Sequence, residues 1–198
     1  QNSIPKHTNI PIVLRVSSGN SILNEDLSNE KLCVSIEDAI RLNASAVAFS
    51  IYIGGAYEHQ TIVEFSKLVN DAHRYGIPVL AVTAVGKDMN RDLRYLSLAS
   101  RIAVELGADI VKTYYCEGFS ELIAACPVPV VIAGGKKVPE LDALEFAHKA
   151  ISDGAAGVDM GRNIFQSDSP ENMIQTVRSV VVNGVEPKDA YEQYKSSL

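Results

Sequence analysis

A lysine set into an apolar run is the residue of this sequence that most directly suggests chemistry. Lys112 lies in the stretch GADIVKTYY (107–115), among β-branched residues typical of a buried strand. Because desolvating an ammonium group is costly, a lysine there is cheaper as a neutral amine, which is a nucleophile toward carbonyl carbons. The run therefore raises the hypothesis of Schiff-base chemistry. The residue alone leaves an alternative open, in which Lys112 ends the strand and its stem carries the charge to water.

Two glycine-containing loops with cations follow the next two strand-like segments, IAGGKK (132–137) and DMGRN (159–163). Glycine lets backbone N–H groups approach phosphate oxygens closely, and Arg or Lys adds charge-assisted hydrogen bonds. One glycine pair alone is more often a tight turn, but two such loops on successive strands favour a phosphate site. The candidate phosphate contacts are Gly134, Gly135, Lys136, Gly161 and Arg162. With Lys112 they indicate a phosphorylated carbonyl substrate.

Three more residues are candidates for supporting roles. Thr83, near the end of a strand-like run, can donate a hydrogen bond to an intermediate or simply fill the strand. Lys87 is either a second cation that favours the neutral amine of Lys112 or a solvated loop lysine. Tyr114 shares the face of Lys112 at the strand period of two, as a proton donor or as packing. Ser17–Ser21 is either a polar active-site loop or an ordinary turn.

Short apolar runs alternate with helical patterns along the whole chain. The expected strands are Pro11–Val16, Ala46–Ile53, Pro78–Val85, Asp109–Tyr115, Val128–Ala133 and Gly157–Met160. The expected helices are Ser35–Asn43, Thr61–Tyr75, Arg91–Leu106, Pro139–Ser152, Pro170–Val182 and Pro187–Ser196. Nearly continuous apolar strands are typical of parallel strands covered on both faces.

Repeated β-α units allow two architectures, a doubly wound sheet or a (β/α)8 TIM barrel. About six units are visible and a closed barrel needs eight, which favours the open sheet. Neither a Gly-x-Gly-x-x-Gly turn nor a Walker motif follows the first strand, which favours the barrel. In barrels the loops after strands 7 and 8 frequently bind phosphate, so Lys112 would lie on strand 6. The expectation is one domain over residues 1–198, holding strands 3 to 8 and a C-terminal helix and lacking the first two βα units.

Composition excludes several classes of protein. The 198 residues are 46% hydrophobic with a net charge of −6, as expected of a globular α/β domain. No basic stripe indicates nucleic-acid binding, and no apolar run is long enough for a bilayer. Three irregularly spaced cysteines fit neither a disulfide framework nor a zinc site, and no signal peptide is visible. The expectation is a cytoplasmic protein without a metal site. The chain has no initiator Met, which suggests a fragment or a processed product.

The motifs GADIVKTYY, CPVPVVIAGGKK and GVDMGRNIFQS resemble the DhnA-type class I aldolase family. They look most like its branch that processes phosphorylated autoinducer-2, a quorum-sensing signal: the 3-hydroxy-5-phosphonooxypentane-2,4-dione thiolases. The motifs keep their order and spacing, and the similarity extends over essentially the whole chain.

The resemblance implies a (β/α)8 barrel in a homo-oligomer, a ring or decamer. It implies Lys112 as the Schiff-base lysine and a phosphate held around the two glycine loops. For the thiolase branch it also implies an acyltransferase that needs no bound cofactor. That enzyme uses coenzyme A as co-substrate and yields acetyl-CoA and dihydroxyacetone phosphate.

Two departures from the family keep alternatives open. Relatives carry two more N-terminal strands, so a truncated, inactive barrel that serves as a binding or assembly module is one alternative. The other is a lyase, a class I aldolase acting on a sugar phosphate such as fructose 1,6-bisphosphate. Such aldolases place an acid/base tyrosine on strand 5, and Ala81–Val85 contains none, which favours the thiolase.

Overall fold

The chain divides into two units, Gln1–Val111 and Lys112–Leu198, with the boundary inside a β-strand. The computed structural model describes residues 10–21, 23, 26–85 and 90–197. Each unit has its own strands, helices and buried side chains. The expectation of one domain over residues 1–198 stays a prediction.

The first unit is built on parallel strands that follow one another in chain order. Its hydrogen-bonded strands are β1 (Val13–Arg15), β4 (Ala46–Ile53), β5 (Val79–Val85) and the start of β6 (Ile110–Thr113). The β1–β4 and β4–β5 pairs are parallel. A short antiparallel hairpin of β2 (Ser17–Ser18) and β3 (Lys31–Leu32) follows β1. The helices are α1 (Ile36–Arg41), α2 (Glu58–Arg74) and α3 (Leu93–Glu105).

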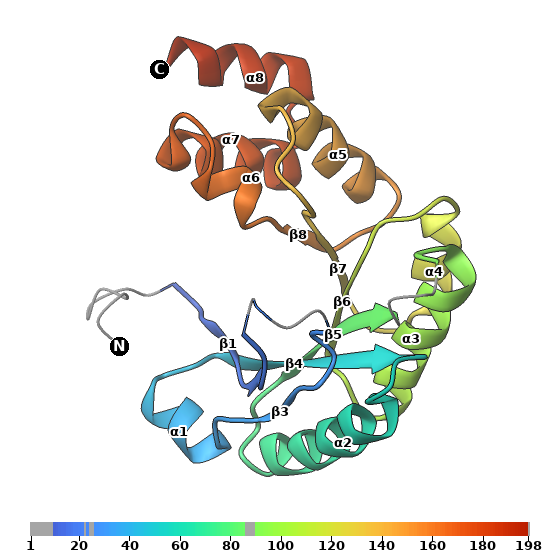
Figure 1. Cartoon of the computed structure of the whole chain (residues 1–198). Coiled ribbons are helices and arrows are strands. Elements are labelled where there is room, and N and C mark those ends of the chain that lie inside the picture. The colour runs from blue at the N-terminus through green and yellow to red at the C-terminus, as the bar shows by residue number, and fades with distance from the viewer. Residues whose placement is uncertain (1–9, 22, 24–25, 86–89, 198) are drawn as a thin grey trace. The chain divides into compact units, whose positions relative to one another are not determined.

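Burial explains why these segments adopt these elements. Seven of the eight residues of β4 are buried, as expected of a strand covered on both faces. α2 packs against β4 and α3 packs against β5 (Figure 1). The buried face of α2 carries Thr61, Phe65, Leu68, Val69 and Ala72, at helical spacing. Ser35 and Asp92 cap the N-termini of α1 and α3 with their side-chain oxygens.

The second unit continues the alternation. It holds the end of β6, β7 (Val130–Ala133) and β8 (Gly157–Asp159), and the β7–β8 pair is parallel. Its helices are α4 (Phe119–Ala125), α5 (Glu140–Ser152), α6 (Arg162–Phe165), α7 (Pro170–Asn183) and α8 (Pro187–Ser196). α5, α7 and α8 pack on one another (Figure 1). Their shared core contains Ala143, Leu144, Met173, Val177, Val180, Ala190 and Tyr194.

Strand order distinguishes the two architectures that the sequence allows. Within each unit every strand of the parallel sheet pairs with the next one along the chain, and the order never reverses. A doubly wound sheet needs such a reversal, whereas a barrel does not. The six predicted strands and six predicted helices are present, with ends within three residues of those expected. The β2–β3 hairpin, α4 and α6 were not among the expected elements.

Candidate active site

Lys112 is the third residue of β6, and its charge is paired. Its side chain is 23% exposed, and Nζ lies 2.6 Å from Oδ2 of Asp159. The flanking Val111 and Thr113 are fully buried, so the alternation of a strand directs Lys112 to the opposite face. The amine is therefore mostly covered and is held by a carboxylate. This state lies between the two that the sequence allowed, a buried neutral amine and a charge carried to water.

Asp159 is a residue that sequence reasoning missed. It ends β8, and its side chain is 53% exposed. Its carbonyl accepts a hydrogen bond from the N–H of Gly134 at 2.9 Å, so the pairing of β7 with β8 fixes its backbone. The available signal was a carboxylate at the carboxyl end of a strand, where sites of parallel α/β folds gather.

Asn163 ties the two glycine loops together, and it too was missed. The residue is 1% exposed, which is unusual for an asparagine unless its polar groups are satisfied. Nδ2 donates to the carbonyls of Gly134 at 2.8 Å and Lys136 at 3.3 Å, while Oδ1 accepts from the N–H of Val138 at 3.0 Å. The structure thus brings together the loops after β7 and β8, which, with Arg162 at the start of α6, carry all five predicted phosphate contacts.

The two predicted cations of these loops, Lys136 and Arg162, are both exposed. The next lysine, Lys137, is engaged differently: its Nζ lies 2.6 Å from Oε1 of Glu140. That hydrogen bond lowers the pKa of the Glu140 carboxyl below its ordinary value. The exposed ammonium and guanidinium groups can bind an anion such as a phosphate, while Lys137 stabilises the start of α5.

The two tyrosines after β6 differ in their surroundings. Tyr115 packs against Phe119 and Phe146, and its hydroxyl donates to Asp153. Burial, and then the neighbouring Asp153 carboxylate, raises the pKa of Tyr115 to about 12. Tyr115 is therefore a packing residue on the side of α4 and α5. Tyr114 is half-buried, and its role as proton donor stays a prediction.

The remaining two candidates belong to the first unit. Thr83 is the fifth residue of β5 and is 1% exposed. Its predicted hydrogen bond to an intermediate stays a prediction. Lys87 lies outside the described residues.

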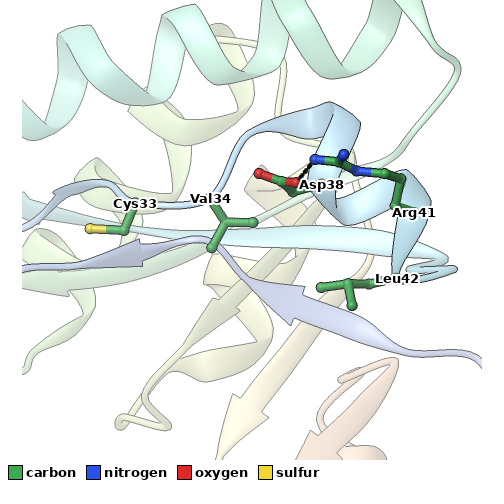
Figure 2. Close-up of a pocket in the computed structure, with 5 residues that line it drawn as sticks. All are labelled: Cys33, Val34, Asp38, Arg41 and Leu42. Carbon is green, nitrogen blue, oxygen red and sulfur yellow. Dashed lines mark hydrogen bonds and ion pairs between the residues drawn. The ribbon is translucent and has the colours of Figure 1, made fainter.

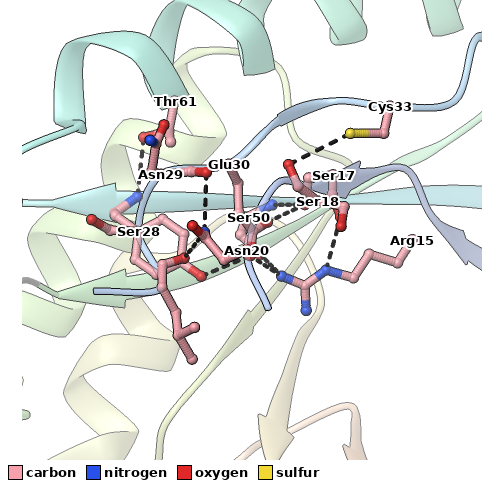
Figure 3. A network of polar contacts seen from close by, with 12 residues as sticks. Arg15, Ser17, Ser18, Asn20, Ser28, Asn29, Glu30, Cys33, Ser50 and Thr61 are labelled. Atoms are coloured by element: carbon pink, nitrogen blue, oxygen red, sulfur yellow. Dashed lines mark hydrogen bonds and ion pairs between the residues drawn. The ribbon is translucent and has the colours of Figure 1, made fainter. Parts of the chain in front are cut away.

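A polar cluster after β1, which we call the Arg15–Glu30 network, was foreseen only as a serine-rich segment. Glu30 is buried, and its carboxylate accepts from Arg15 at 2.5 Å, from Ser17 at 2.5 Å and from Tyr52 at 3.0 Å. Arg15 also donates to Ser50 at 2.7 Å (Figure 3). The network joins the segment before β3 to the ends of β1 and β4.

The electrostatics of the Arg15–Glu30 network follow from these contacts. Burial alone would raise the pKa of Glu30, but hydrogen bonds from Ser17 and Arg15 outweigh it and lower that pKa. Burial, and then the adjacent Glu30 carboxylate, raises the pKa of Tyr52 to about 12. Glu30 is thus a buried anion with full hydrogen-bonding partners, the condition under which a buried charge is tolerated.

Two open pockets are lined by other residues. One of about 630 Å³ is lined by Cys33, Val34, Asp38, Arg41 and Leu42 (Figure 2). The other, of about 470 Å³, is lined by Glu145, His148, Glu186, Pro187, Lys188 and Asp189. Neither contains a predicted site residue. Among the described residues, no group of three or more His, Cys, Asp or Glu is arranged to hold a metal ion. No helix in the described part of the chain is long and apolar enough to cross a membrane.

Comparison with known families places this chain among aldolases. The model of the DeoC/LacD family aldolases matches residues 2–167. The 3-hydroxy-5-phosphonooxypentane-2,4-dione thiolase of Klebsiella pneumoniae is 58% identical over 97% of this chain, and that of Photorhabdus laumondii is 56% identical over 99%. An uncharacterized aldolase of Pasteurella multocida is 57% identical over 96%. The chain spans about two thirds of the length of these curated relatives, 65% to 67%.

Solved structures give the same result for the fold. An archaeal fructose-1,6-bisphosphate aldolase is 29% identical with a TM-score of 0.81, covering 87% of this chain and 71% of its own. Its catalytic lysine was captured bound to the carbinolamine intermediate of the substrate. A fructose-bisphosphate aldolase of Slackia heliotrinireducens, 22% identical, has a TM-score of 0.84 over 96% of this chain and 67% of its own. The predicted barrel architecture and the resemblance to class I aldolases are both confirmed.

Proposed function

This chain belongs to the DeoC/LacD aldolase family, and from that premise we propose that it is a Schiff-base thiolase. Its substrate is phosphorylated autoinducer-2, 3-hydroxy-5-phosphonooxypentane-2,4-dione. The enzyme transfers an acetyl group to coenzyme A and releases acetyl-CoA and dihydroxyacetone phosphate. The observation that carries the proposal is the Lys112 amine, mostly covered and held 2.6 Å from the Asp159 carboxylate on β8.

The phosphate end of the substrate is assigned to the two loops that Asn163 joins. Backbone N–H groups around Gly134, Gly135 and Gly161 approach its oxygens, and the exposed Lys136 and Arg162 supply positive charge. A phosphate anchored there leaves the carbonyl end of a short substrate to reach the amine on β6. Anchoring in this way turns a bimolecular encounter into an intramolecular reaction, the main benefit of binding a non-reacting group.

The covalent chemistry then uses Lys112 as nucleophile. The amine condenses with the ketone at C4 to give an iminium. The thiol sulfur of coenzyme A bonds to C2 and loses its proton, which balances the proton that C3 later receives. As the C2 carbonyl re-forms, the C2–C3 bond breaks and its electron pair moves into the iminium to give an enamine. Proton transfer to C3 and hydrolysis of the imine release dihydroxyacetone phosphate and free the lysine. We assign Tyr114 as proton donor, Thr83 as hydrogen-bond donor to an intermediate, and Lys87 as a second substrate-binding cation.

The proposal also covers the co-substrate, the partners and the oligomeric state. Coenzyme A is a co-substrate, and the chemistry needs no bound cofactor, because the iminium serves as electron sink. We propose a cytoplasmic homo-oligomer, a ring or decamer, that binds neither nucleic acid nor membrane. The formal charge of −6 favours the absence of a nucleic-acid partner.

A sugar-phosphate aldolase is the second candidate, favoured by the 29% to 30% identity to archaeal fructose-1,6-bisphosphate aldolases. It would use Lys112 in the same way and release an aldehyde instead of a thioester. The sequence of β5, VLAVTAV, contains no tyrosine to serve as its acid/base group. We therefore place this activity behind the thiolase.

Borohydride trapping tests the proposal. The protein is incubated with the phosphorylated dione, reduced, digested and mapped by mass spectrometry. We expect an adduct on Lys112 and, when coenzyme A is added without reductant, formation of acetyl-CoA. Cleavage of fructose 1,6-bisphosphate without acetyl-CoA formation would assign the aldolase instead. A folded protein without an adduct on Lys112 would contradict both enzymes and favour the binding or assembly module.

Two variants sharpen the experiment. Lys112→Arg keeps a cation that can pair with Asp159 but has no nucleophilic amine, so we expect a folded protein without adduct or product. Lys149→Arg is the matched control: Lys149 is exposed and lies 5.4 Å from the centre of the Tyr115 ring. It should behave as the unchanged protein does.

A further inference from the structure

We infer that Asp159 is the proton carrier of the Schiff-base reaction: it takes a proton from the ammonium group of Lys112 and delivers it to the departing ketone oxygen. This inference rests on the proposed function and assigns a catalytic role to Asp159, which opens the DMGRN segment but received no role from the sequence. The role is direct, because Oδ2 of Asp159 lies 2.6 Å from Nζ of Lys112, the reacting atom.

The different solvent exposures of the two side chains explain why Lys112 needs a proton acceptor beside it. The lysine side chain is 23% exposed and the aspartate side chain 53%. A mostly covered ammonium group has few routes by which it can lose a proton to water. A half-exposed carboxylate in contact with it provides such a route, since it touches the amine on one side and solvent or substrate on the other.

The carboxylate is also held in place, unlike an ordinary surface aspartate. The N–H of Gly134 donates to the Asp159 carbonyl at 2.9 Å, and the side chain of Asn163 donates to the carbonyl of Gly134 at 2.8 Å. A continuous chain of hydrogen bonds thus runs from the buried Asn163 to the residue that pairs with Lys112. Such support is what keeps a catalytic group within reach of the proton that it moves.

The step balances in atoms and charge. The ammonium group gives one proton to Asp159, and the nitrogen lone pair forms the N–C bond as the C=O π pair moves to oxygen. The resulting carbinolamine oxygen receives the two protons that nitrogen loses, one of them through Asp159, and leaves as water. Ammonium and ketone thus become iminium and water, with one positive charge on each side. The carboxylate that remains faces the iminium cation and stabilises it.

The test is the rate at which the iminium forms in Asp159→Asn. The full chain is mixed with dihydroxyacetone phosphate, quenched with borohydride at successive times, and the Lys112 adduct is quantified by mass spectrometry between about pH 6 and pH 9.5. Asparagine has nearly the same shape but cannot accept the proton. We expect adduct formation about 10²-fold to 10³-fold slower near pH 7, typical for the loss of a general acid or base. The deficit should shrink at high pH, where hydroxide removes the proton.

Controls separate this role from a structural one. Asp168→Asn makes the same charge change at an exposed residue between α6 and α7, and we expect no change in rate. Asp159→Glu, which restores a carboxylate, should recover part of the rate. Equal adduct rates in Asp159→Asn and the unchanged protein at every pH would overturn the inference and leave the proposed function standing. Absence of a Lys112 adduct in the unchanged protein would instead remove the proposed function and, with it, this inference.

Discussion

At the scale of the residue, partners decide what a charged side chain does. Lys112 and Lys137 are both paired with a carboxylate, at 2.6 Å in each case. Lys112 pairs with a carboxylate from another strand and lies on β6, whereas Lys137 pairs with Glu140 three residues away. The first pair can take part in chemistry at the carboxyl ends of strands, and the second stabilises a helix start.

The buried carboxylate of Glu30 leads to a prediction about how the stability of the protein depends on pH. Its pKa is lowered in the folded state, so its ionised form contributes stability that is fully present above the ordinary glutamate pKa of about 4.3. That contribution is lost as the pH falls through the lower folded value. We expect Glu30→Gln to cost about 1–2 kcal/mol near pH 7, a modest value because half of the Arg15 side chain is exposed and solvent screens the pair.

The measurement is urea unfolding of both proteins between about pH 3 and pH 8. The difference between them should be constant above about pH 5 and should shrink at lower pH. Glu105→Gln is the control, since the Glu105–Arg101 pair is about 60% exposed on both sides and should contribute little. A difference that grew as the pH fell would contradict the role of Glu30 as a buried anion.

At the scale of the element, the contact between the loops after β7 and β8 is set by close packing. A Cβ atom on Gly134 would lie 2.7 Å from Cγ and 3.0 Å from Cα of Met160. Gly135 differs: its φ is +68°, and a Cβ atom there would meet nothing within 4 Å. One glycine is thus required by a neighbour, and the other by its own backbone conformation.

These neighbours make a matched pair of variants. We expect Gly134→Ala to push Met160 and the adjoining Asp159 outward, costing about 1–3 kcal/mol and slowing iminium formation at Lys112. Gly135→Ala should cost about 1–2 kcal/mol through backbone strain but displaces no side chain next to Asp159. Because both glycines are proposed phosphate contacts, the rates are compared at saturating substrate, where Gly135→Ala should slow iminium formation less than Gly134→Ala does. Thermal unfolding and borohydride trapping measure the two effects. Equal trapping rates for both variants would show that contact between the loops does not position Asp159.

At the scale of the whole molecule, the edges of the parallel sheet matter. β1 stands at one end of the strand order and pairs with β4 on one side in the described part of the chain. It also carries Val13, which is 47% exposed. Unpaired backbone groups beside an apolar side chain are prone to pair with another chain. We predict that a protein of these 198 residues self-associates through the β1 edge.

We therefore expect light scattering after size exclusion to give a mass above that of one chain, increasing with protein concentration. Val13→Lys should lower that mass, because a charged side chain on an edge strand opposes further pairing. Ile40→Lys makes the same change on α1, at a residue that is 41% exposed, and should not lower it. A single-chain mass for the unchanged protein at all concentrations would contradict self-association and the proposed oligomer.

The sequence by itself determined the alternation of elements, the parallel sheet and the family. Continuous apolar runs such as Ala46–Ile53 are buried on both faces, and hydrophobic spacing along Thr61–Ala72 marks the covered face of a helix, because both patterns are local. The motifs around Lys112, Gly134 and Arg162 are also made of residues that are adjacent in the chain, so the sequence alone is enough to recognise them.

Only the tertiary structure decided which side chains meet. Asp159 on β8 pairs with Lys112 on β6, two strands away in the order of the sheet. Asn163 on α6 donates to the carbonyl of Gly134 in the loop after β7. Glu30 is a buried anion because the hairpin returns it to Arg15 and Ser17. These contacts join residues far apart in the chain, and the free energy of each depends on distances that spacing along a sequence does not contain.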